Sequence, residues 1–369
     1  MFGINNFKKY NMKQLLLVLI LITTAVNYSY SQHNIIQDSE SGSYNVGFKH
    51  ETVTDYSRSF GNTYRPIELF IWYPSNEKRD PTLNYTDYLL IKDKSKNLDS
   101  LILKSIELLG ISADKDIILK NYKRLKTSAI ENTMIADSSY PLILFAPGGR
   151  TPGYLHSVIC EYLASNGYIV VGLSALGNYE NSRWPFDQTG LNLQIDDMSF
   201  AINYLKHEMS QINIDKICLA SWSVGGVAQT LYAMKNSNID MFVSLDSGIG
   251  RTYGIEMIKE SPYFNYSKMD IPYLHFTGTQ PEQFNVERSN ELYDSIPSKN
   301  KYLKTIIPFA HQHFTSQNGL INDLISENQD KVLANAYLMM CYTTRVFVDA
   351  FLKEDTIAKT ELLDLIKTE

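Results

Sequence analysis

The sequence predicts an α/β fold with a doubly wound, mostly parallel sheet. Short apolar runs alternate with amphipathic helical stretches along most of the chain, as at residues 141–149, 168–173, 216–220 and 241–245. Runs that are apolar throughout are typical of strands buried on both faces, as in parallel sheets covered by helices. The right-handed rule for crossover connections then favours a doubly wound arrangement.

Local patterns place the other elements. The first strands are expected at residues 44–54 and 67–73, the second because of its alternation and its aromatic content. Two further strands are expected at residues 272–277 and 303–308. Helical periodicity is present near residues 153–166, 191–208, 286–295 and 330–351, and directly after Ser223.

The pattern changes between residues 82 and 137. Charged helical segments such as LDSLILKSIELLG stand between the second and third expected strands, without strand signals. We interpret this stretch as an inserted helical lid, with an ordinary surface excursion as the alternative. No Pro- or Gly-rich linker divides residues 32–369, which are therefore expected to form one domain with an insertion at about 82–137.

The first 31 residues are predicted to be a signal peptide. Lys8, Lys9 and Lys13 precede an apolar run at residues 15–26, which is about half the length that spans a bilayer. Small residues at Ser29 and Ser31 suit cleavage before Gln32. We expect a secreted or periplasmic protein with no stable membrane span after cleavage, and an uncleaved anchor is the rival interpretation.

Charge and cysteine content narrow the possible partners. The net charge is −6, the pI is near 5.7, and no long basic run is present, so nucleic acid and acidic membrane surfaces are not expected partners. Cys160, Cys218 and Cys341 lie in apolar patterns with no metal-ligand spacing. We expect buried free thiols, with one disulfide as the alternative; the sequence leaves the oligomeric state open.

Ser223 is the candidate nucleophile. The segment Ser221-Trp222-Ser223-Val224-Gly225 stands where a buried strand turns sharply into a helix. Such a turn lifts a serine hydroxyl above the sheet edge, and small residues two positions before and after it let the backbones pass closely. Ser221 stands where glycine is usual, and it lacks a glycine two positions later, so it is the poorer nucleophile. An ordinary strand-to-helix turn is the competing interpretation.

A nucleophilic serine needs a histidine base and a carboxylate that orients it. His311 and His313 follow the last expected strand, at the edge where α/β sheets place catalytic groups. His311 directly follows the strand and is preferred. For the carboxylate, Asp246 ends the run MFVSLD and fits the order Ser, Asp, His, whereas Glu282 is the alternative after the next strand.

The oxyanion of a tetrahedral intermediate needs two backbone donors. One candidate is the N–H of Val224, the residue after the nucleophile. The other is the N–H of Gly149 in the turn Pro147-Gly148-Gly149-Arg150. Trp184 and Trp222 are candidate substrate-binding residues, with core packing as the alternative.

At these residues the chain resembles the plasma-type platelet-activating factor acetylhydrolases and related bacterial esterases of the α/β-hydrolase fold, including dienelactone hydrolase relatives. The resemblance rests on DYSRSFGNTYRPIELFIWYPS, LILFAPGG, EYLASNGYIVVGL, INIDKICLASWSVGG, VSLDSG and the His-Gln-x-Phe stretch at residues 311–314. Pro147 stands where the family usually has histidine. The resemblance implies a Ser223–Asp246–His311 triad, an oxyanion hole at Gly149 and Val224, short-acyl ester cleavage, and neither metal nor cofactor.

These observations predict a serine hydrolase that cleaves small extracellular carboxylic esters through an acyl-enzyme. A peptidase on the same fold is one alternative, because nothing in the sequence favours an ester over an amide. A catalytically silent, hydrolase-like binding protein is the other alternative.

Overall fold

The structure is a computed structural model that describes residues 41–92, 94–108, 114–149, 151–279, 286–321 and 331–367. The expected signal peptide and Glu282 lie outside these residues. In the described chain the strands form one nine-stranded sheet in the order β3-β1-β2-β5-β4-β6-β7-β8-β9. The strands are β1 (Asn45–Phe60), β2 (Thr63–Ser75), β3 (Ala129–Glu131), β4 (Tyr140–Ala146), β5 (Ile169–Leu173), β6 (Ile212–Trp222), β7 (Met241–Leu245), β8 (Tyr273–Gly278) and β9 (Lys301–Ile306).

The sheet is mostly parallel, which confirms the predicted fold class. Strand β2 pairs antiparallel with both β1 and β5, whereas the strands from β5 to β9 are all parallel. The central strands β4, β5 and β7 are buried at every residue, whereas the edge strand β9 is only partly buried. The carboxyl ends of the parallel strands meet at one edge of the sheet, which we call the carboxyl edge.

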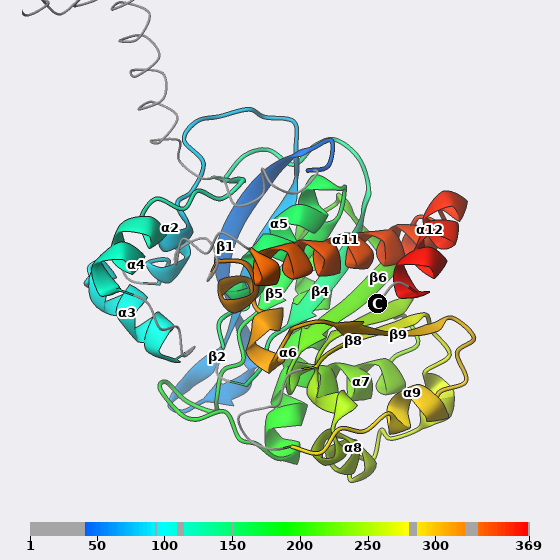
Figure 1. The fold of residues 1–369 in the computed structure, drawn as a ribbon. Coiled ribbons are helices and arrows are strands. Elements are labelled where there is room, and N and C mark those ends of the chain that lie inside the picture. The colour runs from blue at the N-terminus through cyan, green and yellow to red at the C-terminus, as the bar shows by residue number, and fades with distance from the viewer. Residues whose placement is uncertain are drawn as a thin grey trace, which may run out of the picture.

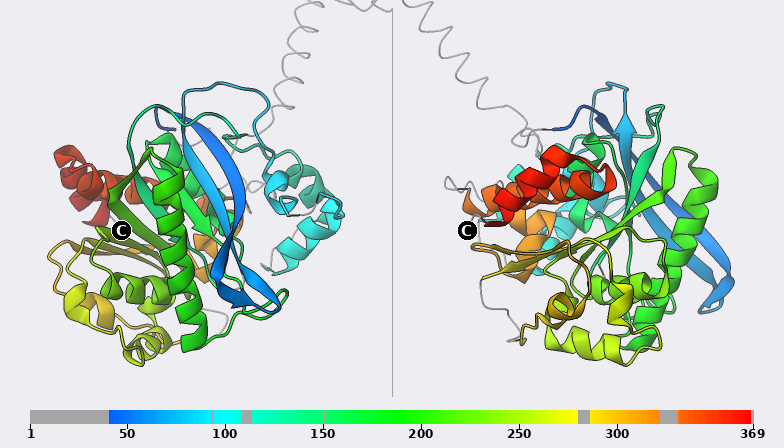
Figure 2. Two further views of the ribbon diagram at one scale, coloured as in Figure 1. Left: turned by 180° about the vertical axis from the view of Figure 1, so that it is seen from behind. Right: turned by 90° about the vertical axis from the view of Figure 1, so that its right-hand side faces the viewer.

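Helices cover both faces of the sheet (Figures 1 and 2). One apolar core joins one face to α5 (Ser157–Ser165), α11 (Val332–Leu352) and α12 (Thr356–Lys367). A second core joins the other face to α6 (Gln188–Glu208), α7 (Gly225–Lys235) and α8 (Thr252–Lys259). The short α9 (Glu291–Ser295) lies near these helices in Figure 1.

Residues 82–137 contain the expected helical segments and one strand that the sequence did not signal. The helices are α2 (Tyr85–Leu89), α3 (Leu98–Leu108) and α4 (Lys115–Tyr122). The strand β3 pairs parallel with β1 and extends the sheet at that edge. The insertion packs on the sheet through Tyr88, whose hydroxyl accepts a 2.8 Å hydrogen bond from Trp72 Nε1.

Several other details differ from the sequence prediction. The helices α8 and α12 were not predicted, and the helix expected at residues 286–295 is formed only at Glu291–Ser295. The three cysteines are free and buried, in agreement with the preferred prediction. Within the described residues, no helix is both long and apolar enough to cross a bilayer.

Candidate active site

Ser223 occupies the sharp turn between β6 and α7. Its backbone has a φ of +57°, a left-handed conformation that a residue with a side chain seldom adopts. The Ser223 carbonyl accepts hydrogen bonds from the N–H groups of Gly226, at 3.1 Å, and Gly248, at 2.6 Å. These bonds fix the turn and leave the half-buried Ser223 side chain at the carboxyl edge, as expected for a nucleophile elbow.

Close packing explains the small residues around Ser223. A Cβ atom on Gly225 would lie 2.4 Å from the carbonyl oxygens of both Ala146 and Pro147, so only glycine lets α7 approach β4 this closely. Ser221 is fully buried, and its Oγ would lie 2.8 Å from a Cβ on Gly226. Gly226 therefore leaves room for the side chain of Ser221. Because Ser221 is fully buried, it is not a candidate nucleophile.

Asp246 and His311 lie in direct contact at the same edge. Asp246 follows β7 with a φ of +46°, and His311 begins the short turn His311–Phe314 after β9. The distance from His311 Nδ1 to Asp246 Oδ2 is 2.8 Å. An ionised carboxylate only accepts hydrogen bonds, so this contact places a proton on Nδ1 and leaves Nε2 as the basic nitrogen.

Two arginines hold the Asp246 carboxylate. The buried Arg251 donates from Nη2 to Oδ2 at 2.7 Å and from Nη1 to the carbonyls of Asp246 and Ser247. Arg288, which is more exposed, lies 3.3 Å from Oδ1. Burial alone would raise the pKa of Asp246, but the hydrogen bond from His311 and the charge of Arg251 lower this pKa to about 2. Asp246 is therefore ionised at neutral pH.

Trp222 fixes the His311 ring. The two rings stack at 4.7 Å with an interplanar angle of 18°, and Trp222 Nε1 donates to the His311 carbonyl at 3.0 Å. Behind Trp222 lies His156, which is fully buried and stacks on Phe145 at 4.4 Å. Burial lowers the pKa of His156 to about 3, so this ring is neutral and packs as an aromatic group. Trp222 thus contacts the candidate base.

The Ser223 hydroxyl makes no hydrogen bond to His311 in the described part of the chain. Its neighbour Trp222 is what joins the elbow to the histidine turn. Hydrogen bonds between a nucleophile and its base are often long in ligand-free enzymes and shorten when substrate binds. The arrangement thus places the three expected residue types at one edge.

The two expected oxyanion donors lie side by side. A Cβ on Gly149 would be 3.4 Å from Val224 Cγ1, and a Cβ on the preceding Gly148 would be 3.0 Å from Ser223 Cβ. The N–H groups of Gly149 and Val224 donate to no acceptor in the described structure. Two uncommitted backbone donors next to the candidate nucleophile can stabilise an oxyanion.

Trp184 packs against this turn. Its Cε3 atom would be 2.9 Å from a Cβ on Gly149, and the side chain is 4% exposed. Trp184 therefore packs against the backbone of the oxyanion turn, and only a small part of its surface is open to a ligand.

The other histidine candidates have different partners. His313 Nδ1 accepts a hydrogen bond from the Ala310 N–H at 2.9 Å, which commits it to its own turn. His275 Nδ1 lies 2.7 Å from Ser244 Oγ, but these residues are register partners inside β8 and β7 and are almost completely buried. Since a substrate carbonyl cannot reach Ser244 there, this pair is structural.

Sequence reasoning missed Arg251 and Arg288. Arg251 stands five residues after Asp246 in VSLDSGIGR, a spacing that could have drawn attention to it. Arg288 pairs across with Arg251 in an isolated β-bridge, which depends on the tertiary fold. Among the described residues, no cluster of three or more His, Cys, Asp or Glu side chains could hold a metal ion.

Part of the chain matches a known protein family. Residues 28–175 match the family model described as "Platelet-activating factor acetylhydrolase, isoform II". The chain is similar to these acetylhydrolases. The predicted resemblance is thus confirmed over less than half of the chain, a stretch that includes the turn at Gly149 and ends before Ser223.

A solved structure shares the fold of this chain. A ferulic acid esterase from Streptomyces cinnamoneus superposes with a TM-score of 0.63 at 17% sequence identity. The superposition covers 88% of this chain and 94% of that esterase, and at this identity it shows the fold alone. No curated protein matches the chain. The chain therefore has an α/β-hydrolase-like fold, and part of it is similar to platelet-activating factor acetylhydrolases.

Proposed function

We propose that this chain is a serine carboxylic-ester hydrolase in which Ser223, His311 and Asp246 form the catalytic triad. The observation that carries the proposal is the 2.8 Å contact between His311 and the buried, arginine-held Asp246, at the edge where the Ser223 turn lies. The similarity to acetylhydrolases supports an ester as the substrate.

The reaction would proceed in two steps. His311 Nε2 takes the proton of Ser223 as Oγ bonds to the ester carbonyl carbon, and the N–H groups of Gly149 and Val224 stabilise the resulting oxyanion. The bond to the alcohol oxygen then breaks, and the imidazolium returns its proton to the leaving alcohol. A water molecule, deprotonated by His311, attacks the acyl-enzyme and releases the carboxylic acid.

Hydrolysis of p-nitrophenyl esters from acetyl to octanoyl tests this proposal. We expect the acetyl ester to be the best substrate and Ser223→Ala to lower kcat by about 10³-fold or more. Ser221→Ala is the matched control, because Ser221 is buried two residues away; its rate should stay within a few-fold. Equal rates for the Ser223 variant and the unchanged protein would exclude Ser223 as the nucleophile.

We further propose that the protein acts outside the cytoplasm, on small extracellular esters. The charged start and short apolar run of residues 1–31 support this proposal. Mass spectrometry of the protein from its native host should find an N-terminus at Gln32. A chain that retains residues 1–31 would contradict cleavage and favour an anchored protein.

A further inference from the structure

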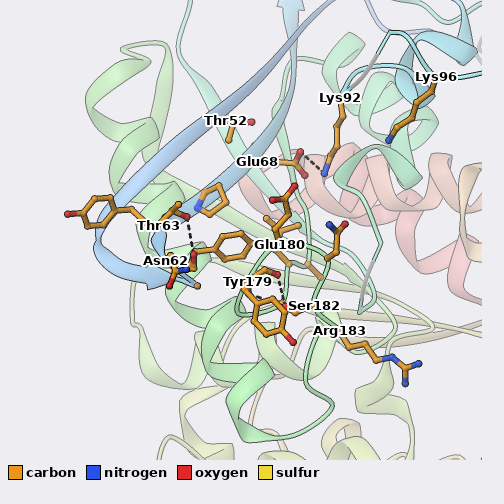
Figure 3. Close-up of a pocket in the computed structure, with 18 residues that line it drawn as sticks. Thr52, Asn62, Thr63, Glu68, Lys92, Lys96, Tyr179, Glu180, Ser182 and Arg183 are labelled. Carbon is orange, nitrogen blue, oxygen red and sulfur yellow. Dashed lines mark hydrogen bonds and ion pairs between the residues drawn. The ribbon is translucent and has the colours of Figure 1, made fainter.

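A cavity of about 1160 Å³ opens between the β1–β2 hairpin and the loop that follows β5 (Figure 3). It is lined by the tip of the β1–β2 hairpin, by the loop at residues 175–183 that follows β5, and by Lys92 and Lys96 of the insertion. The loop touches the oxyanion turn at both of its ends. The Ala175 N–H donates to the Thr151 carbonyl, and Arg183 precedes Trp184, which packs on Gly149.

Strand register explains why the hairpin forms a wall of this cavity. Leu69 of β2 pairs antiparallel with Leu173, the last residue of β5. The part of β2 before Leu69 therefore extends past the carboxyl edge and carries the hairpin tip with it. Glu68 of β2 lines the cavity, and β5 and β4 separate β2 from β6, so this residue lies three strand spacings, or about 14 Å, from the elbow along the sheet. The side chains of Ser223 and Glu68 span part of that distance, and the alcohol part of an ester bound at Ser223 would span the rest.

The floor of the cavity holds a buried carboxylate with a free oxygen. Glu68 is 7% exposed, and its Oε1 lies 2.7 Å from Lys92 Nζ and 3.8 Å from His50 Nε2. Burial alone would raise the pKa of Glu68, but His50, Lys92 and the Ser174 hydroxyl lower it to about 2. Glu68 Oε2 makes no hydrogen bond of ordinary geometry in the described structure, so Ser174 is at most a weak donor to the carboxylate. A buried, ionised oxygen without a close hydrogen bond is a strong acceptor for a ligand.

The rest of the lining is suited to hydroxyl groups. Asn62 and Asn181 supply amide donors and acceptors, and Phe60, Tyr64 and Tyr179 supply ring faces. In Figure 3 the ammonium groups of Lys92 and Lys96 point into the cavity, whereas Arg183 points away. A ligand cation would meet these two lysines, and an acyl chain would leave the carboxylate and the amides without partners.

We propose that this cavity binds a neutral, polyhydroxylated alcohol portion of the substrate, so that the enzyme deacylates esterified carbohydrates. The proposal rests on the ester-hydrolase function proposed above and specifies its substrate. In it, Glu68 Oε2 accepts a hydrogen bond from a sugar hydroxyl, and Tyr179 covers one face of the ring.

A matched pair of acetyl esters tests the proposal. Methyl 6-O-acetyl-β-D-glucopyranoside carries ring hydroxyls, whereas cyclohexylmethyl acetate has a ring of the same size without them. We expect kcat/KM for the glucoside to be about tenfold or more higher, because hydrogen bonds to a charged group contribute roughly 1.5–3 kcal/mol. Equal values, or a preference for the cyclohexyl ester, would overturn the proposal.

Variants locate this preference in the cavity. Glu68→Gln and Tyr179→Ala should each raise KM for the glucoside about tenfold and leave hydrolysis of the cyclohexyl ester within a few-fold. Tyr179 is 59% exposed, so its replacement does not threaten folding if the Glu68 variant is unstable. Ile357→Ala is the control, because this exposed α12 residue lies outside the cavity lining. A glucoside preference that persists in both cavity variants would contradict the assignment.

Binding separates this proposal from the catalytic one. Calorimetry on the Ser223→Ala protein should detect the acetylated glucoside, and adding Tyr179→Ala should weaken that binding about tenfold. Unweakened binding in the double variant, or none in the Ser223→Ala protein, would overturn the cavity assignment even if Ser223 is the nucleophile. Conversely, hydrolysis that survives Ser223→Ala would refute the catalytic proposal and leave the binding result intact.

Discussion

Two buried carboxyl groups in this chain have pKa values shifted in opposite directions, and the difference comes from their partners. Asp246 and Glu161 are both at most 1% exposed. Asp246 contacts His311 and two arginines, and its pKa is lowered to about 2. Burial raises the pKa of Glu161 to about 7, since its partners are the neutral Tyr88 hydroxyl and the Ser128 N–H, both at 2.8 Å.

Two equally buried carboxyl groups thus have different roles, which depend on the groups that contact them. At the carboxyl edge, cations keep Asp246 ionised so that it can orient His311 and stabilise an imidazolium. Under the insertion, Glu161 joins α5 to α2 through Tyr88, a contact that needs hydrogen bonds and no charge. Replacing each carboxylate by its amide should therefore have very different consequences.

The largest effect is expected for Asp246→Asn. The amide cannot select the His311 tautomer that leaves Nε2 basic, so kcat for p-nitrophenyl acetate should fall by about 10⁴-fold. Asp215→Asn, an exposed site on β6, is the control and should keep full activity. If Asp246→Asn lost less than tenfold, Asp246 would not be the orienting carboxylate.

Arg251→Met should have the next largest effect, on stability. Removing one partner of a buried ion pair leaves the other charge uncompensated, which destabilises a protein by about 3–5 kcal/mol. Urea unfolding at pH 7 measures this change. A free energy of unfolding within 1 kcal/mol of the unchanged protein would show that Asp246 does not depend on Arg251.

Glu161→Gln should stabilise the protein above neutral pH. Because the folded-state pKa of Glu161 is raised from 4.5 to about 7, its contribution to stability is complete below pH 4.5 and is lost as the pH rises through 7. The variant lacks this loss, which amounts to roughly 3 kcal/mol. Urea unfolding at pH 5 and pH 8 should show a gain for the variant that grows with pH; a constant difference would refute the raised pKa.

The contribution of Asp246 to stability depends on pH in the opposite direction to that of Glu161. Its folded-state pKa lies below 3.8, so its contribution to stability is present above pH 4 and is lost as the pH falls towards 2. Unfolding curves between pH 5 and pH 2.5 should therefore converge for the unchanged protein and Asp246→Asn. Parallel curves over that range would contradict an ionised, arginine-held carboxylate.

The smallest change in the free energy of unfolding is expected for Arg288→Ala. This arginine reaches the same carboxylate at 3.3 Å, but its side chain is 37% exposed and is screened by solvent. Such pairs contribute about 0–1 kcal/mol, so the stability should change by no more than that. A loss comparable to that of Arg251→Met would mean that both arginines hold Asp246 equally.

The sequence located the triad candidates because each one follows an expected strand of the parallel sheet. Ser223 and Asp246 come directly after apolar runs that mark buried parallel strands, and His311 follows β9, which is more polar but also parallel. Parallel strands bring their carboxyl ends to one edge. The structure also distinguishes the two histidines by contact, since His311 Nδ1 lies 2.8 Å from Asp246 Oδ2 and His313 Nδ1 accepts a hydrogen bond from the Ala310 N–H.

Features set by tertiary register could not be predicted in this way. The strand β3 has three residues, too few for a period to be recognised, and it forms because β1 offers it an edge. The cavity wall depends on how far β2 overhangs β5, and the role of Arg251 depends on the turn after Asp246. None of these leaves a local pattern in the chain.

Covalent labelling tests the central claim most directly. A fluorophosphonate reacts quickly only with an activated serine, so the protein should take up one equivalent, and peptide mapping should place it on Ser223. Labelling should be abolished in Ser223→Ala and slowed strongly in Asp246→Asn. A label on another serine, such as Ser221 or Ser244, or no labelling of the intact protein, would contradict the proposed active site.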